Sequence, residues 1–88
     1  MLDANVWVGG FELDLVARRG RTIVFVEVKS KSGAGFGDPL EMVTPLKEQR
    51  IRRAAAAWLA EHDVAGLDVR FDVIAVRGRR VEHLRGAF

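Results

Sequence analysis

Three carboxylates and one lysine interrupt an otherwise apolar stretch between Gly10 and Ser30, and this pattern limits the folds open to the chain. The stretch reads GFELDLVARRGRTIVFVEVKS, and the four charged residues are Glu12, Asp14, Glu27 and Lys29. Such side chains are rarely buried unless they are paired or bind a ligand. A fold that uses both apolar runs as strands must therefore expose these groups or give them a partner.

The spacing of the four charges predicts that they share one face of a hairpin. Side chains alternate between the faces of a strand, so Glu12 and Asp14 lie on one side of the first strand. On the second strand, the face that carries Phe25 also carries Glu27 and Lys29. Strict alternation also places Val16 with Glu12 and Asp14, and Leu13 on the opposite face.

The polar link Arg18–Arg21 separates the two strands and suits a tight turn. A turn centred on Arg19-Gly20 places Glu27 opposite Glu12 and Phe25 opposite Asp14. A slip of one residue would send the charges to opposite faces, so the prediction depends on this register.

Three carboxylates at one place would raise each other's pKa values or recruit a cation. Mg²⁺, or Mn²⁺ in its place, is the simplest partner because hard divalent ions take oxygen ligands. Lys29 would then hold a phosphate or orient a water molecule. The alternative is an exposed hairpin face that carries ordinary solvated charges.

The whole sequence fits one small domain, residues 1–88, without cysteine and without a signal peptide or an apolar run of membrane-spanning length. A cytoplasmic location is therefore expected. The formal net charge is +2, which weakly favours a polyanionic partner.

A helix is expected to begin at Thr44, the N-cap, with Pro45 in its first turn. Its apolar stripe comprises Ile51, Ala54, Ala55, Trp58 and Leu59. Basic residues crowd the first half of this helix, where they oppose the helix dipole. Phosphate contact would explain them, and the candidates for nucleic-acid binding are Lys47, Arg50 and Arg53, with Lys31 from the preceding segment. A solvated helix face is the alternative.

Three further features complete the pattern. The glycine-rich segment 33–39 is expected to be a mobile loop, either beside the substrate or a plain connector. Strands are expected near residues 5–8, 68–76 and 81–84. Trp7 is interpreted as a packing residue, with stacking on a base as the alternative, and His62 and His83 as surface or packing residues.

Asp14, followed after twelve residues by Glu27-Val28-Lys29, resembles the D…(D/E)xK signature of the PD-(D/E)xK nuclease superfamily. A wider and more specific resemblance covers nearly the whole chain from Gly10. The segments GFELDLVA, IVFVEVKS, FGDPLEMVTPLKEQRIRRAAAAWL, RFDVIAV and HLRGAF resemble the YraN-like bacterial family, which is similar to archaeal Holliday-junction resolvases.

This resemblance implies an α/β, restriction-endonuclease-like fold, with a mixed central sheet and a flanking helix. It implies Asp14 and Glu27 as metal ligands, with Lys29 positioning or activating the attacking water. Further positions that it suggests are Glu12 as an additional acidic residue, the backbone carbonyl of Val28 as a ligand, and Gln49 as a polar site residue.

Members of that family begin with a helix that carries a glycine-glutamate motif and covers one face of the sheet, and the present sequence starts too late to contain it. Truncation, cover by a second protomer or loss of activity would each account for this departure. Exposed apolar sheet surface favours self-association, so a homodimer is expected.

The sequence therefore predicts a Mg²⁺-dependent endonuclease that cleaves DNA, including branched DNA. One alternative is a nucleic-acid-binding module that keeps the fold but does not cut. Another is a protein-interaction factor whose acidic cluster is only a surface feature.

Overall fold

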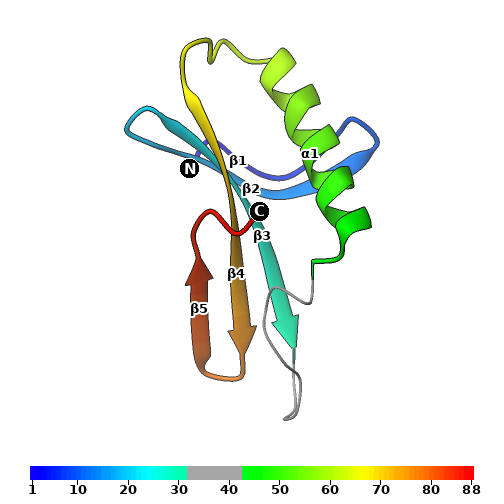
Figure 1. Cartoon of the computed structure of the whole chain (residues 1–88), viewed down its shortest axis with the longest axis vertical. Helices are drawn as coiled ribbons and strands as arrows, with labels where there is room; N and C mark the ends of the chain where they lie inside the picture. Colours follow the sequence, from blue (N-terminus) through cyan, green and yellow to red (C-terminus); the bar gives the residue numbers. More distant parts are fainter. Residues whose placement is uncertain (32–42) are drawn as a thin grey trace.

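The computed structural model describes residues 1–31 and 43–88, so the expected loop 33–39 lies outside the described residues. Its elements are β1 (Asp3–Val8), β2 (Phe11–Arg19), β3 (Thr22–Lys31), α1 (Pro45–Ala60), β4 (Asp68–Arg77) and β5 (Arg80–Leu84). The strands form one five-stranded sheet in chain order, with β3 and β4 parallel and the other neighbouring pairs antiparallel (Figure 1). This mixed α/β architecture confirms the expected fold class and is consistent with a restriction-endonuclease-like fold.

The helix begins as the sequence predicts. The side chain of Thr44 accepts a hydrogen bond from the Lys47 N–H at 3.3 Å, and Pro45 occupies the first turn. The stripe that faces the sheet is buried at Ile51, Ala54, Ala55 and Trp58, while Leu59 is half-buried. Small alanines allow the helix axis to approach the sheet closely, and α1 contacts both β1 and β2.

An aromatic cluster joins α1 to the centre of the sheet. The ring of Phe25 on β3 meets Trp58 edge to face, with centroids 5.7 Å apart, and stacks on Phe71 of β4 at 5.6 Å. All three side chains are buried. Aromatic pairs in these geometries add to the free energy gained from burial, so this contact holds the helix over β3.

The predicted β2–β3 register is wrong by two residues. The ladder pairs Arg19 with Thr22, so Gly20-Arg21 forms the turn, and Val16 rather than Asp14 lies opposite Phe25. Gly20 has φ +59°, a conformation that glycine adopts without steric cost. Because the error is an even number of residues, the predicted assignment of β3 side chains to faces is unaffected.

The prediction that side chains alternate strictly between the two faces of β2 is also wrong. Leu13 and Val16 both lie in the hydrophobic core under α1, although an odd spacing should separate them. The interruption falls where Asn5 of β1, with φ +49°, lies across from Asp14. The β1–β2 register is the same on both sides of this point, so the backbone irregularity inserts no extra residue and is not a β-bulge, and the sequence pattern does not reveal it.

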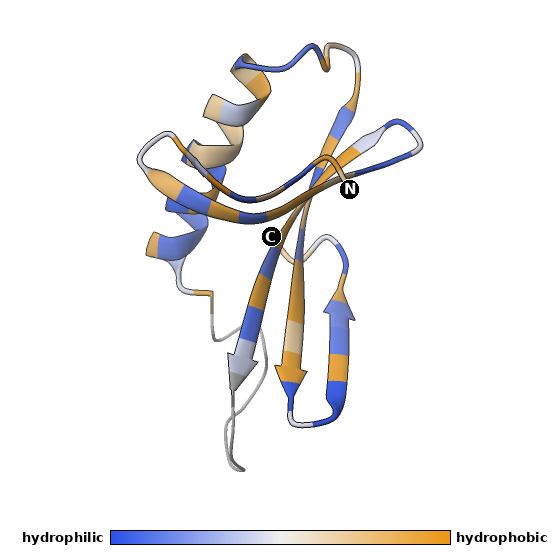
Figure 2. Ribbon diagram, turned by 180° about the vertical axis from the view of Figure 1, so that it is seen from behind, coloured by the Kyte–Doolittle hydropathy of each residue, from blue (hydrophilic) through white to orange (hydrophobic). Residues whose placement is uncertain are grey.

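Viewed from behind, the strands lie in front of α1, and no described helix covers this face (Figure 2). The described part of the chain contains no helix long and apolar enough to cross a membrane. Val28 on the outer face is 37% exposed. The homodimer expected from the sequence stays a prediction.

Gly9 offers a test of the packing between the β1–β2 turn and α1. A Cβ at Gly9 would lie 3.0 Å from the Ala57 Cβ, whereas one at Gly10 meets nothing within 4 Å, and both glycines have positive φ. Gly9→Ala should therefore lower the free energy of unfolding by about 2–4 kcal/mol, and Gly10→Ala by only about 1–2 kcal/mol. Urea unfolding would measure both, and equal losses would contradict the close approach of helix and turn.

Candidate functional site

Glu27 and Lys29 extend the buried face of β3 to the point where α1 begins. They follow Phe25 at two-residue steps and therefore share its face, which is the face under the helix. The Lys29 Nζ lies 3.2 Å from the Glu27 Oε1, and the two side chains are only 21% and 14% exposed. The sequence correctly placed these two groups together.

Asp14 is positioned where the β2–β3 ladder stops. Backbone pairing is regular up to Leu15 opposite Val26, and beyond it the Asp14 side chain takes the place of a backbone acceptor. The Val28 N–H donates to the Asp14 Oδ2 at 2.8 Å. This bond ties the two strands together and fixes the peptide between Glu27 and Val28.

The Glu27 carboxyl is in an unfavourable environment for its charge. Burial raises its pKa above the ordinary value, and the neighbouring Asp14 carboxylate raises the pKa further. Lys29 acts in the opposite direction but does not cancel these effects. A carboxyl whose pKa is shifted by burial and by a specific charged neighbour is common at functional sites.

A pocket of about 240 Å³ lies between the end of β3, the β1–β2 hairpin and the first half of α1. Its lining residues are Trp7, Phe11, Glu12, Glu27, Lys29, Lys47, Arg50 and Ile51. The structure thus brings Glu12, Glu27 and Lys29 to one cavity, as predicted. Asp14 approaches Glu27 but is not among the residues that line this pocket.

The described residues contain no group of three His, Asp or Glu side chains arranged to hold a metal ion. The expected set of three carboxylate ligands is therefore not preformed. Asp14 and Glu27 still supply the oxygen donors that Mg²⁺ prefers. Mg²⁺ commonly takes one or two protein carboxylates and completes its shell with water and substrate phosphate. The donor chemistry fits such an ion.

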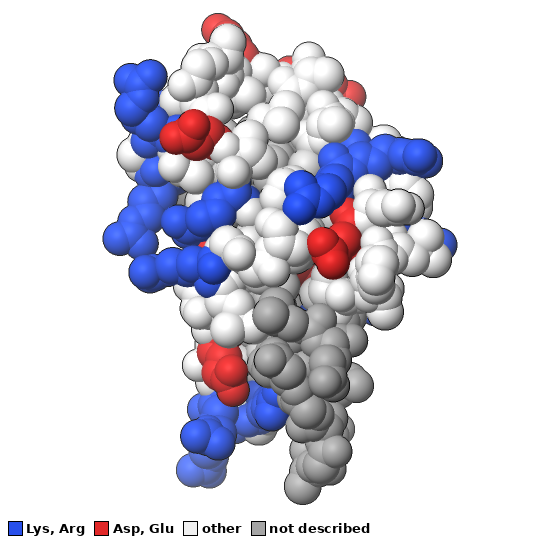
Figure 3. All heavy atoms as spheres, in the orientation of Figure 1, with Lys and Arg blue, Asp and Glu red and all other residues white. Residues whose placement is uncertain are grey.

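The basic residues predicted on α1 surround the same cavity. Lys47 and Arg50 line it, and Arg53 and Gln49 line an adjoining pocket of about 200 Å³. The Arg50 guanidinium lies 5.7 Å from the centre of the Phe11 ring. Figure 3 shows basic side chains on both sides of the molecule, with more on the side away from α1 than on the side of the helix. The side chain of Lys31 lies outside the described residues.

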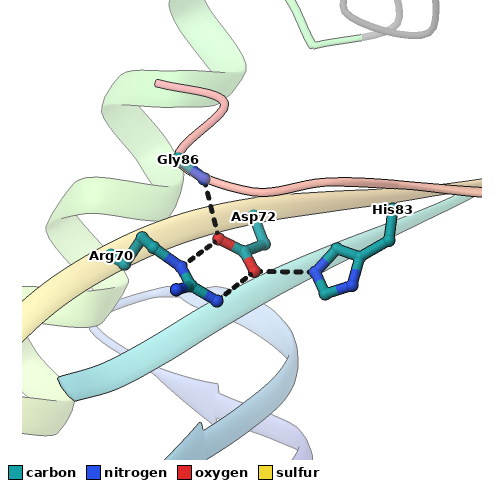
Figure 4. Close-up of polar contacts among 4 residues, drawn as sticks. All are labelled: Arg70, Asp72, His83 and Gly86. Carbon is teal, nitrogen blue, oxygen red and sulfur yellow. Dashed lines mark hydrogen bonds and ion pairs between the residues drawn. The ribbon is translucent and has the colours of Figure 1, made fainter. Parts of the chain in front are cut away.

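Sequence reasoning missed a second ionic cluster around Asp72 on β4 (Figure 4). This carboxylate is fully buried and accepts two hydrogen bonds from Arg70, at 2.8 and 2.9 Å. The His83 Nε2 lies 2.7 Å from the Asp72 Oδ2, and the Gly86 N–H donates to the Oδ1 at 3.0 Å. His83, interpreted as a surface or packing residue, is a partner of this carboxylate.

The partners of Asp72 offset the cost of burying its charge, whereas the partners of Glu27 do not. Burial alone would raise the pKa of Asp72, but the hydrogen bonds from Arg70, Gly86 and His83 hold that pKa below its ordinary value. The ionised form is thus the stable one, which indicates a structural role. The two-residue spacing of Arg70 and Asp72 in one strand was the available signal, because it places both on one face.

Asp72→Asn should lower the free energy of unfolding by about 3 kcal/mol, because it leaves the Arg70 charge without its partner. Asp68→Asn, at an exposed position on the same strand, should change it by less than about 0.5 kcal/mol. Since the folded pKa of Asp72 is depressed, its stabilisation is complete above the unfolded pKa near 4 and is lost as the pH falls through the folded pKa. Urea titrations at several pH values would measure this, and equal effects of the two substitutions would contradict it.

Glu27→Gln should raise the melting temperature at pH 7 in buffer without divalent cations. Because the pKa of Glu27 is higher in the folded protein than in the unfolded chain, the ionised carboxylate destabilises the fold. This destabilisation is absent below the unfolded pKa and complete above the folded pKa. The stabilisation by Gln should accordingly disappear at acidic pH. Glu12→Gln is the control, because Glu12 is exposed in the same pocket. An unchanged melting temperature at pH 7 would exclude electrostatic strain at Glu27.

Comparison with known proteins places the chain in a family. The family model described as "Uncharacterised protein family UPF0102" matches residues 1–76. A UPF0102 protein of Beutenbergia cavernae is 62% identical over 80 residues, which cover 85% of this chain and 68% of the relative. A UPF0102 protein of Geobacter sulfurreducens is 44% identical over 93 residues, covering 100% of this chain and 73% of the relative. The chain therefore belongs to the UPF0102 family, and this confirms its resemblance to the YraN-like proteins.

Proposed function

We propose that this protein hydrolyses phosphodiester bonds in nucleic acid, with DNA as the first candidate, with the help of a divalent cation. The observation that carries the proposal is the half-buried Glu27 carboxyl. Its pKa is raised, Asp14 adjoins it, and Lys29 lies 3.2 Å away in a pocket that also contains basic helix residues. The ion pair with Lys29 only partly offsets the burial of Glu27 and the proximity of Asp14, and a bound cation would offset them further.

Asp14 and Glu27, with the backbone carbonyl of Val28, are the proposed ligands of Mg²⁺ or Mn²⁺. The bound ion would polarise a phosphoryl oxygen and stabilise the charge that develops on it. The hydrogen bond from the Val28 N–H to Asp14 holds the Glu27–Val28 peptide, which precedes the peptide that carries the Val28 carbonyl, and so restrains this backbone segment before any ligand arrives. Glu12, exposed at the wall of the pocket, stays a weaker candidate for a ligand.

Lys29 would orient the attacking water or contact the phosphate. Its ammonium group is largely buried beside Glu27, and it is therefore held close to the place where the scissile bond would lie. If Glu27 bound a cation, the Lys29 ammonium would no longer pair with this carboxylate and would contact a water molecule or a phosphate oxygen instead. Groups positioned in this way accelerate a reaction because they orient the reactants and stabilise the charge of the transition state.

Lys47, Arg50 and Arg53 would hold the sugar-phosphate backbone without reading its sequence. These side chains are exposed on α1 and line the site pocket or its neighbour. Cations near a helix N-terminus oppose the helix dipole, so helix stability does not explain them. Binding that depends on such contacts weakens steeply with added salt.

A second candidate is a nucleic-acid-binding module that does not cut. It is favoured by the ion pair between Lys29 and Glu27, which engages both groups, and by the lack of a three-ligand acidic group among the residues described. This candidate uses the same basic residues but needs no cation.

Cleavage assays with labelled single-stranded, duplex and four-way-junction DNA separate the two candidates. With Mg²⁺ or Mn²⁺ we expect cutting, and we expect Lys29→Ala and Asp14→Asn each to lower the rate by about 100-fold or more. Arg79→Ala, at an exposed position in the turn between β4 and β5, should leave the rate unchanged.

Cutting that persists in both site variants would refute the proposed mechanism. Salt-sensitive binding that is the same in EDTA, without cleavage under any condition, would select the non-catalytic module instead.

A further inference from the structure

Trp7 is the exposed aromatic residue in the wall of the candidate site. Its side chain lies on β1, directly opposite Glu12 in the strand ladder, and 71% of its surface is exposed. The other tryptophan, Trp58, is 1% exposed. The interpretation of Trp7 as a packing residue is therefore wrong.

The pocket beside Trp7 has two chemically different parts. Trp7, Phe11 and Ile51 supply apolar surface, and the charged residues of the site occupy the rest of the lining. Arg50 lies over the Phe11 ring, which places a cation next to the apolar wall. A ligand that fills this pocket should be flat and apolar on its faces and should carry negative charge at its edge.

A nucleobase attached to its phosphate has these properties. Bases stack on exposed aromatic side chains, and this contact does not depend on sequence because every base has a π face. In a continuous duplex, however, each base is already stacked between its neighbours and cannot enter a pocket in a protein wall. A base can reach Trp7 when it is unpaired.

We propose that Trp7 stacks on an unpaired base and thereby makes single-stranded nucleic acid the preferred ligand of the site. The inference rests on the proposed function, because it assumes that the phosphate beside the base is the one presented to Glu27 and Lys29. The base would lie along Trp7, while Lys47 and Arg50 contact the backbone. The preference for single strands would arise from the pocket wall rather than from base-specific hydrogen bonds.

The test is binding in EDTA, where cleavage by a divalent cation cannot occur. Oligo(dT), oligo(rU) and a blunt DNA duplex of equal length would be titrated while tryptophan emission is recorded. Because Trp58 is buried, quenching should report on Trp7. We expect quenching by the single strands and little by the duplex. Equal quenching by oligo(dT) and oligo(rU) would support stacking, and quenching by the duplex alone would overturn the proposal.

Variants of Trp7 make the test independent of the optical signal. Fluorescence anisotropy of labelled oligonucleotides should show that Trp7→Ala weakens single-strand binding by about tenfold or more and leaves duplex binding nearly unchanged. Trp7→Phe should restore part of the loss, because it keeps an aromatic face. Val81→Ala removes apolar surface from an exposed position on β5 and should have no effect.

An equal loss of affinity for single strands and duplex in Trp7→Ala, or no loss for either, would overturn the stacking proposal. Circular dichroism would verify that the variant is folded, as expected for an exposed side chain. Failure of the proposed nuclease activity gives a different result. In that case Trp7-dependent binding of single strands persists in EDTA, but no strand is cut after Mg²⁺ or Mn²⁺ is added.

Discussion

The contact between Phe25 and Trp58 fixes the relation between the helix and the sheet, and the candidate site depends on that relation. Phe25 also stacks on Phe71, so one ring connects α1, β3 and β4. Because side chains at two-residue steps share a face, this contact places Glu27 and then Lys29 under the first half of the helix. Without the aromatic contact, the carboxylate would lie on an open strand, where water would stabilise its charge and little perturbation of its pKa would remain.

The protein buries carboxylates in two different ways. Asp72 is fully enclosed, but a guanidinium, an imidazole and a backbone amide surround it, and its pKa is lowered. Glu27 is less buried, yet its pKa is raised because a second carboxylate adjoins it. The degree of burial therefore does not distinguish a structural charge from a functional one. The balance of partners is the better guide, and by this criterion Glu27 rather than Asp72 is the candidate for a functional group.

Much of the fold could be predicted from local patterns, and the errors arise where distant residues decide the structure. The helix cap at Thr44, the apolar stripe of α1 and the shared face of Glu27 and Lys29 depend on residues close in sequence, and these predictions are confirmed. The register of β2 on β3 differed by two residues because several turns fit the link that contains Gly20. The partners of Asp72 were missed because His83 and Gly86 are distant along the chain. The ligand and metal assignments stay predictions.

The parallel pairing of β3 with β4 divides the chain into two parts that form in different ways. Strands β1 to β3 and strands β4 to β5 are joined by short turns, whereas the parallel pair requires a long crossover that includes α1. Contacts between distant residues cost more loop-closure entropy, so we expect the parallel pair to form more slowly than the hairpins. In that pair Glu27 lies opposite Val73 and Lys29 opposite Ala75. The walls of the site pocket all precede β4 in the chain, so a growing chain on the ribosome would complete them first and add the neighbouring strand beneath Glu27 and Lys29 only when β4 has emerged.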